Sequence, residues 1–243
     1  MKNIRISVEY DGTSFAGWQR QPGGIVTVQG EIEGALGRIL QEAVTLSAAG
    51  RTDRGVHARA QTASFHTASS MELSRMVHSL NCLLPDTVRV FDPVEVSPDF
   101  HARFSAKERH YRYFLLEHPS AIYGRFAGCS NGTLDLDVMN CFAREVVGVH
   151  DFSAFAREDR DSSGSDCHVY SCGWSREDRT LVFKIEANRF LRSMVRYLVD
   201  AMTRAGRGEL SKGDFVAMLS SGKGSSSLTP ASPAGLFLWK VTY

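Results

Sequence analysis

Residues 4–10 read Ile-Arg-Ile-Ser-Val-Glu-Tyr, so apolar and polar side chains alternate strictly. Alternation with a period of two is typical of a β-strand with one buried face. Apolar residues then recur at helical spacing over 28–43, which predicts an amphipathic helix. The pattern continues with a strand near residue 46, a strand over 59–66, a helix over 71–80 and a strand over 88–96.

The second half of the chain repeats this order of strand, helix, strand, strand, helix, strand. Its expected elements are a strand over 109–117, a helix over 134–147, a hairpin of 169–174 and 180–187, a helix over 189–205 and a final strand over 236–243. Two β-α-β-β-α-β halves are a ferredoxin-like duplication. The sequence therefore predicts an α+β fold of two RRM-like halves with mainly antiparallel sheets, in domains 1–105 and 106–243.

The composition is that of a folded protein, with 243 residues, 43% hydrophobic and 23% charged residues and a net charge of +1. Positive charge is concentrated in the windows 51–59, 101–113 and 187–207, which carry +2, +3 and +4, so the rest of the chain carries −8. In the third window, helical spacing places Arg189, Arg192 and Arg196 on one polar face. Such a face is either ordinary solvated surface or a set of phosphate or carboxylate partners.

The sequence contains no apolar stretch of the length of a secretion signal or a membrane span, so we expect a cytoplasmic protein without a membrane partner. Five cysteines without a CxxC pair argue against a disulfide framework and against a cysteine-type zinc site. Glycine-rich phosphate loops, dinucleotide fingerprints and metal-binding histidine pairs are absent from the sequence as well. We therefore expect neither a metal nor a nucleotide cofactor.

The densest polar motif is Gly50-Arg51-Thr52-Asp53-Arg54-Gly55-Val56-His57-Ala58. It places one carboxylate, Asp53, among two arginines and a histidine, and neighbouring cations favour the ionised form of an acid. Such a carboxylate serves as a nucleophile, as a base or as a structural ion pair. The pattern alone leaves these three roles open.

This motif resembles the GRTDxGVHA signature of the TruA-type tRNA pseudouridine synthases. Five further blocks of that family occur in the family's order: YDGTSFAGWQRQ from residue 10, FHARFSA with RHYRY over 100–113, HDFSAF from 150, NRF with MVR over 188–196, and AGLFL from 234. The resemblance covers nearly the whole chain.

The resemblance implies an isomerase that converts uridine to pseudouridine at positions 38–40 of the tRNA anticodon stem-loop, as a homodimer and without a cofactor. Asp53 is then the nucleophile, which attacks either the base or the sugar, in a central cleft flanked by the two sheets. By the same resemblance Tyr111 stacks on the target base, and Arg196 pairs with Asp53. Arg51 is a candidate for flipping or holding the nucleotide.

Three features depart from the family pattern. Arg54 stands where a small residue is frequent, Ser193 replaces a common histidine, and the segment 157–168 is acidic. The acidic segment puts its contact with RNA in question. Two other functions compete with the enzyme: an RNA-binding or tRNA-chaperone module without catalysis, and a small-molecule hydrolase that uses Asp53, for which a second carboxylate at a recognisable spacing is missing.

Overall fold

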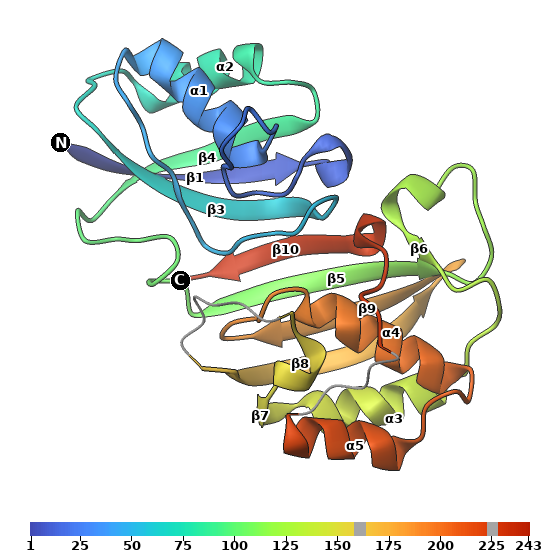
Figure 1. Cartoon of the computed structure of the whole chain (residues 1–243). Helices are drawn as coiled ribbons and strands as arrows, with labels where there is room; N and C mark the ends of the chain where they lie inside the picture. The colour runs from blue at the N-terminus through green and yellow to red at the C-terminus, as the bar shows by residue number, and fades with distance from the viewer. Residues whose placement is uncertain (158–163, 223–227) are drawn as a thin grey trace. The chain divides into compact units, whose positions relative to one another are not determined.

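The computed structural model describes residues 1–157, 164–222 and 228–243, and its contacts divide the chain into two compact units. The first unit comprises Met1–Lys107 and Leu238–Tyr243, and the second comprises Glu108–Phe237. Both units combine helices with sheet (Figure 1), which confirms the predicted α+β class. The division into domains 1–105 and 106–243 stays a prediction, and the contacts group the last six residues with the first unit.

The first unit has the predicted order of elements. These are β1 (Lys2–Tyr10), α1 (Val28–Leu40), β2 (Ser47–Ala48), β3 (His57–Thr67), α2 (Leu73–Leu83) and β4 (Val88–Val96). The strands lie in the order β4-β1-β3, β2 also pairs with β3, and these pairs are antiparallel. The C-terminal strand β10 (Leu236–Thr242) is the next neighbour of β3.

The core of the first unit follows from the alternation in β1. Ile4, Ile6 and Val8 are completely buried, and Ile6 lies opposite Ala63 of β3. Helices α1 and α2 lie together over one face of these strands (Figure 1), and both contribute buried apolar residues. Burial of one face of the sheet under two helices is the packing that the period-two pattern predicts.

The second unit also follows the predicted order, with short additions. Its elements are β5 (Glu108–Leu116), β6 (Gly128–Cys129), α3 (Leu136–Val146), β7 (Gly148–Asp151), β8 (Asp166–Glu177), β9 (Thr180–Ala187), α4 (Met194–Gly206) and α5 (Lys212–Ser221). The strand order is β5-β9-β8-β7 with antiparallel neighbours, and β6 runs parallel to β5. The predicted hairpin is confirmed as β8 and β9, whereas β6 and β7 were not predicted.

The helices of the second unit gather on its strands around an aromatic core. The ring of Phe215 in α5 lies 5.0 Å from that of Phe142 in α3 and 5.2 Å from that of Phe155. Trp174 of β8 packs on Phe183 of β9, with ring centroids 4.9 Å apart. This packing fixes β9, the strand beside β5.

One predicted helix is wrong in its first turn. The helix expected from residue 189 begins at Met194, because Ser193 has a left-handed backbone with φ of 60°. Arg189 and Arg192 precede the helix, so they do not share a helical face with Arg196. A backbone hydrogen bond from Asn188 N to His168 O, 3.1 Å long, fixes the chain that precedes this turn to β8.

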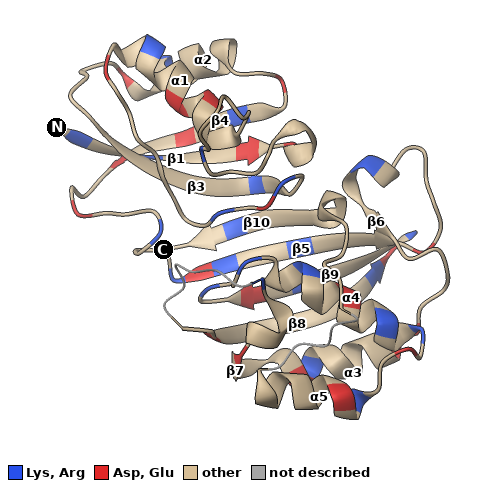
Figure 2. Ribbon diagram, in the orientation of Figure 1, with Lys and Arg blue, Asp and Glu red and all other residues tan. Residues whose placement is uncertain are grey.

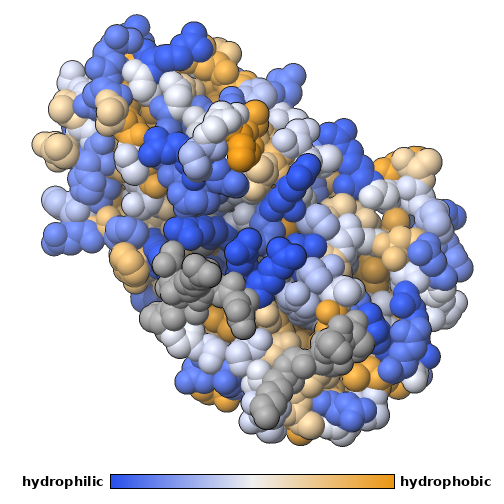
Figure 3. Space-filling view, viewed as in Figure 1, coloured by the Kyte–Doolittle hydropathy of each residue, from blue (hydrophilic) through white to orange (hydrophobic). Residues whose placement is uncertain are grey.

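Charged and apolar residues are distributed over both units. Figure 2 shows basic residues on β5 and on α4 of the second unit. On the face drawn in Figure 3, hydrophobic surface occurs as separate patches between hydrophilic residues. Within the part of the chain that the structure describes, helices are too short or too polar to cross a bilayer.

Candidate active site

Asp53 lies in the loop between β2 and β3, which we call the aspartate loop (residues 49–56). Thr52 is only 7% exposed, whereas Asp53 is half-buried, and Arg51 and Arg54 are exposed. A backbone bond from Val56 N to Asp53 O, 3.1 Å long, closes a tight turn after the carboxylate. The loop thus exposes part of Asp53 while its immediate neighbour is anchored in the unit.

The aspartate loop is held by the clasp segment (residues 11–18), which connects β1 to the residues before α1. Trp18 N donates to Thr52 O at 3.2 Å, and Gly55 N donates to Phe15 O at 3.4 Å. Backbone bonds on both sides of Asp53 therefore join two segments that are far apart in the sequence. Because these are bonds between backbone atoms, they hold the loop in place without using its side chains.

Two glycines of the clasp segment make this approach possible. Gly17 has φ of +103°, and a Cβ at this position would lie 2.6 Å from Thr52 O. A Cβ on Gly12 would overlap the carbonyl oxygen of Val56. At position 17 only glycine permits both the left-handed backbone and the close contact, and at position 12 only glycine permits the close contact. The glycines of the YDGTSFAGW block are thereby explained as contacts to the aspartate loop.

Two buried side chains add to these contacts. The hydroxyls of Tyr10 and Thr52 share a hydrogen bond of 2.8 Å. The Gly12 amide donates to Nδ1 of His57 at 3.0 Å, and the His57 side chain is completely buried. Tyr10 thus fixes the middle of the aspartate loop and His57 fixes the residue that follows it, and both belong to the motifs that the sequence singled out.

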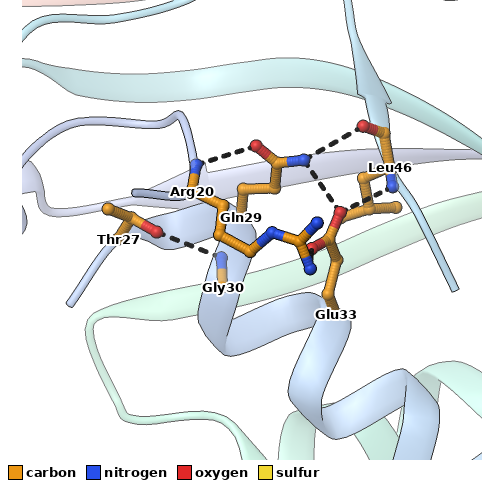
Figure 4. Close-up of polar contacts among 6 residues, drawn as sticks. All are labelled: Arg20, Thr27, Gln29, Gly30, Glu33 and Leu46. Carbon is orange, nitrogen blue, oxygen red and sulfur yellow. Dashed lines mark hydrogen bonds and ion pairs between the residues drawn. The ribbon is translucent and has the colours of Figure 1, made fainter. Parts of the chain in front are cut away.

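A polar network joins Arg20, which follows the clasp segment, to α1 and to the chain before β2 (Figure 4). Thr27 caps α1 by accepting a bond from Gly30 N at 3.2 Å. Gln29 accepts a bond from Arg20 N at 2.9 Å, and its amide nitrogen donates to Glu33 Oε1 at 2.8 Å. The first turns of α1 are thereby bound to the end of the clasp segment.

Glu33 is the centre of this network, and it is only 6% exposed. Its Oε1 also accepts the amide of Leu46 at 2.8 Å, and its Oε2 lies 3.1 Å from Nη1 of Arg20 (Figure 4). A buried carboxylate needs such partners, because its desolvation is otherwise costly. Glu33 therefore links Arg20, just after the clasp segment, to the chain that leads into the aspartate loop.

In the second unit, Tyr111, Tyr113 and Leu115 of β5 share one buried face, as predicted. Tyr111 is 8% exposed, and its ring meets that of Phe190 edge-on, with centroids 5.0 Å apart and an angle of 82°. This contact joins β5 to the segment between β9 and α4. Phe190 belongs to the NRF block, so two family blocks meet at this tyrosine.

Tyr113 has different surroundings from Tyr111. It is 1% exposed and closely packed, since a Cβ on Gly235 would lie 2.7 Å from its ring. Burial raises the pKa of Tyr113 far above its usual value, although the charge of Arg196 opposes this shift. The hydroxyl of Tyr113 is therefore neutral, and the residue serves the core.

Arg196 lies in the first turn of α4 and is half-buried. Its Nε donates to Ala231 O at 2.6 Å, and Ala231 N donates back to Arg196 O at 3.1 Å. Asp200, one turn later, accepts bonds from Thr229 N at 3.1 Å and from Arg204 Nε at 2.9 Å. The segment before β10 is thus bound along α4, and it fixes the guanidinium of Arg196.

The predicted site residues are divided between the two units. Asp53 and Arg51 lie in the first unit, and Tyr111 and Arg196 lie in the second. The acidic segment 157–168 lies partly outside the described residues, which omit 158–163. Among the described residues, no group of three His, Cys, Asp or Glu side chains is arranged to hold a metal ion.

Gln29 and Glu33, which hold Leu46 in the chain that leads into the aspartate loop, were not predicted from the sequence. A signal for them exists in the helical pattern. They are polar residues four positions apart, and both lie beside the buried Ile32 of α1. Polar residues beside the apolar side of a helix indicate a buried polar network.

A family model described as tRNA pseudouridine synthase matches residues 6–105 and 142–243. The chain belongs to this family of isomerases, whose reaction is the isomerisation of uridine in tRNA. It is 68% identical to tRNA pseudouridine synthase A of Pelodictyon phaeoclathratiforme, with all of both chains covered. The protein of the same name from Chlorobium luteolum is 63% identical, with all of this chain and 96% of the relative covered.

More distant proteins are also similar to this chain. The tRNA pseudouridine synthase A of Nitrosomonas eutropha is 38% identical, with 99% of this chain and 87% of the relative covered. Among solved structures, a Cbf5-Nop10-Gar1 complex chain aligns with a TM-score of 0.37 and 12% identity, over 97% of this chain and 48% of that chain. The assignment to the family rests on the sequence matches and not on this structural likeness.

Proposed function

We propose that the protein converts uridine to pseudouridine at positions 38–40 of the tRNA anticodon stem-loop, with Asp53 as the nucleophile. The observation that carries this proposal is the anchoring of the aspartate loop. Thr52 is buried and bonded on its backbone and its side chain, while the adjacent Asp53 carboxylate is half-buried. A nucleophile held in one position by its neighbours loses little freedom when the substrate arrives.

The reaction rearranges bonds within one nucleotide. The bond from N1 of uracil to C1′ of ribose breaks, and a bond from C5 to C1′ forms. The proton on C5 is lost and N1 gains a proton, so no net oxidation or reduction occurs. The balanced reaction therefore needs no redox cofactor, and an ionised carboxylate serves as a covalent catalyst.

The other proposed roles come from the family resemblance and from the surroundings of each residue. Tyr111 stacks on the target base, as the family resemblance implies, because an aromatic ring stabilises an extruded base by stacking. Arg196 pairs with the Asp53 carboxylate, as the family resemblance implies. Arg51 is exposed beside Asp53 and helps to hold the flipped nucleotide.

The proposal also includes the partners. The enzyme acts as a homodimer in the cytoplasm and takes tRNA as its substrate. The basic windows of the sequence then contact phosphates, and tRNA binding should weaken steeply as salt increases.

The test is pseudouridine mapping on unmodified tRNA transcripts after incubation with the protein. Tritium placed on C5 of uridine should be released during turnover by the wild type. The variant Asp53→Asn should lose release and product by at least about 10³-fold while its tRNA Kd changes little, because it lacks only the nucleophile. Asp86→Asn is the matched control, since its side chain is fully exposed on the same unit. An active Asp53→Asn enzyme would refute the assignment of the nucleophile. If the wild type bound tRNA without forming pseudouridine, the protein would be an RNA-binding module without catalysis.

A further inference from the structure

We propose that Phe104 is a stacking platform for an unpaired base of the tRNA, remote from the uridine that reacts. This inference rests on the proposed function, because it names a second contact with the same substrate. The feature that led to it is the side chain of Phe104, which is 76% exposed although the neighbouring Ala102 is completely buried.

Exposure alone carries little weight, since single apolar residues are common on protein surfaces. The backbone around Phe104 is unusually well fixed for such a position. Ala102 N donates to the buried hydroxyl of Ser64 at 3.1 Å, and its carbonyl accepts the hydroxyl of Tyr243 at 2.9 Å. A rigid turn thus presents the ring, so little conformational entropy is lost when a ligand binds to it.

The turn is closed by further bonds on either side of the ring. Ser105 N donates to His101 O at 2.9 Å, and His101 N donates to the Ser105 hydroxyl at 3.1 Å. Arg103 N donates to Nδ1 of His101 at 3.1 Å. The two residues that flank Phe104 in the sequence are therefore held in place.

The neighbours of the ring indicate the kind of ligand. The His101 ring lies 4.5 Å from the ring of Phe104, and the guanidinium carbon of Arg103 lies 5.5 Å from its centroid. An apolar protein partner would have to bury the charge of Arg103 at this contact. An RNA base stacks on an aromatic face and brings a phosphate that pairs with arginine, so RNA fits this surface better.

The turn and the aspartate loop both lie along β3. The loop begins beside Thr62, whose carbonyl accepts the Ala49 amide, and it ends at His57, seven residues along β3 from Ser64, which anchors the turn. At about 3.3 Å per residue in a strand, this distance is roughly 23 Å. On this proposal the base held by Phe104 differs from the base that reacts, so its contact is the same in the ground state and in the transition state.

The experiment compares tRNA binding and turnover by the wild type and by Phe104→Leu, both as full-length protein. Stacking contributes about 1–3 kcal/mol per base, so Kd and KM should rise by about tenfold while kcat is unchanged. The slope of log Kd against log salt should not change, because phenylalanine neutralises no phosphate. Phe104→Trp should retain the wild-type Kd, and its tryptophan emission should be quenched by tRNA. Tyr123→Leu removes an exposed aromatic ring from the second unit, and it should leave Kd unchanged.

Three results would overturn the proposal. The first is a Kd of Phe104→Leu within twofold of the wild-type value. The second is a lower kcat with an unchanged Kd, which would place Phe104 in the chemistry. The third is a change in oligomeric state without RNA, which would make the occupant a protein surface. Because tRNA binding is measured without turnover, failure here is distinct from failure of the Asp53 assignment.

Discussion

Replacing Glu33 by alanine should lower the free energy of unfolding by about 2–4 kcal/mol. The variant removes the acceptor of two buried hydrogen bonds, from Leu46 N and from Gln29 Nε2, both 2.8 Å long. A buried donor without a partner costs about 1–3 kcal/mol. The Leu46 amide loses its acceptor, so the full free-energy cost applies to it. Gln29 Nε2 keeps its bond to Leu46 O at 3.2 Å, so its loss of Glu33 costs less free energy.

The ion pair between Arg20 and Glu33 should matter less than these hydrogen bonds. The Arg20 side chain is 61% exposed, and ion pairs with exposed partners contribute about 0–1 kcal/mol. Arg20→Met should therefore destabilise by less than about 1 kcal/mol. Glu33→Gln retains an oxygen acceptor and should cost about 1 kcal/mol.

The assay is urea unfolding followed by far-UV circular dichroism and by tryptophan fluorescence. Trp18 is 1% exposed, and its carbonyl accepts the backbone amide of Gln29 at 3.0 Å, so it contributes a signal from this region to the emission of the three tryptophans. Hydrogen exchange of the Leu46 amide should also be faster in Glu33→Ala. If Arg20→Met destabilised as much as Glu33→Ala, the ion pair would dominate and the reasoning from buried hydrogen bonds would be refuted.

Three further outcomes are expected. Gly12→Ala should lower kcat by about tenfold or more with little change in tRNA Kd, since the new methyl group overlaps the Val56 carbonyl and displaces the aspartate loop; wild-type kcat would contradict this. The hydrogen bond from Arg176 lowers the pKa of Glu117. The small stabilisation from this bond is therefore present above the unfolded pKa of about 4.3, and it is lost as pH falls through the folded pKa. Urea midpoints at pH 7 and pH 3 should differ less in Arg176→Met than in the wild type. Burial raises the pKa of Cys167 to about 11, so mass spectrometry should find this thiol alkylated by iodoacetamide at pH 8 only after unfolding.

Period-two and helical patterns predicted most of the fold, because a strand or helix that buries one face has apolar residues at regular spacing in the sequence. The β8–β9 hairpin and β1 are examples. The start of α4 was mispredicted, because Phe190 and Leu191 fit the helical spacing while Ser193 is left-handed. Apolar spacing does not report backbone conformation.

Consecutive residues of the candidate site are visible in the sequence, whereas residues that meet only by tertiary contact are not. Asp53 stands out in its motif, and the arginines beside it are visible in the sequence. The contact of Gly17 with Thr52 joins segments 35 positions apart, and no local pattern reports it. The support from Glu33 is of the same kind, because Leu46 comes near α1 only in the folded chain.

The return of the chain to its first unit has a consequence for biosynthesis. Residues 238–243 belong to that unit, where Tyr243 bonds to Ala102 and Thr242 O accepts the Lys107 amide. On a ribosome the first 107 residues emerge long before this last strand is made. Until then β3 lacks its neighbour β10, and an open strand edge is a site for pairing with other chains. The edge of β3 in the nascent first half therefore stays unpaired until translation ends. During this time it needs protection from pairing with other chains, and in the finished protein β10 covers it.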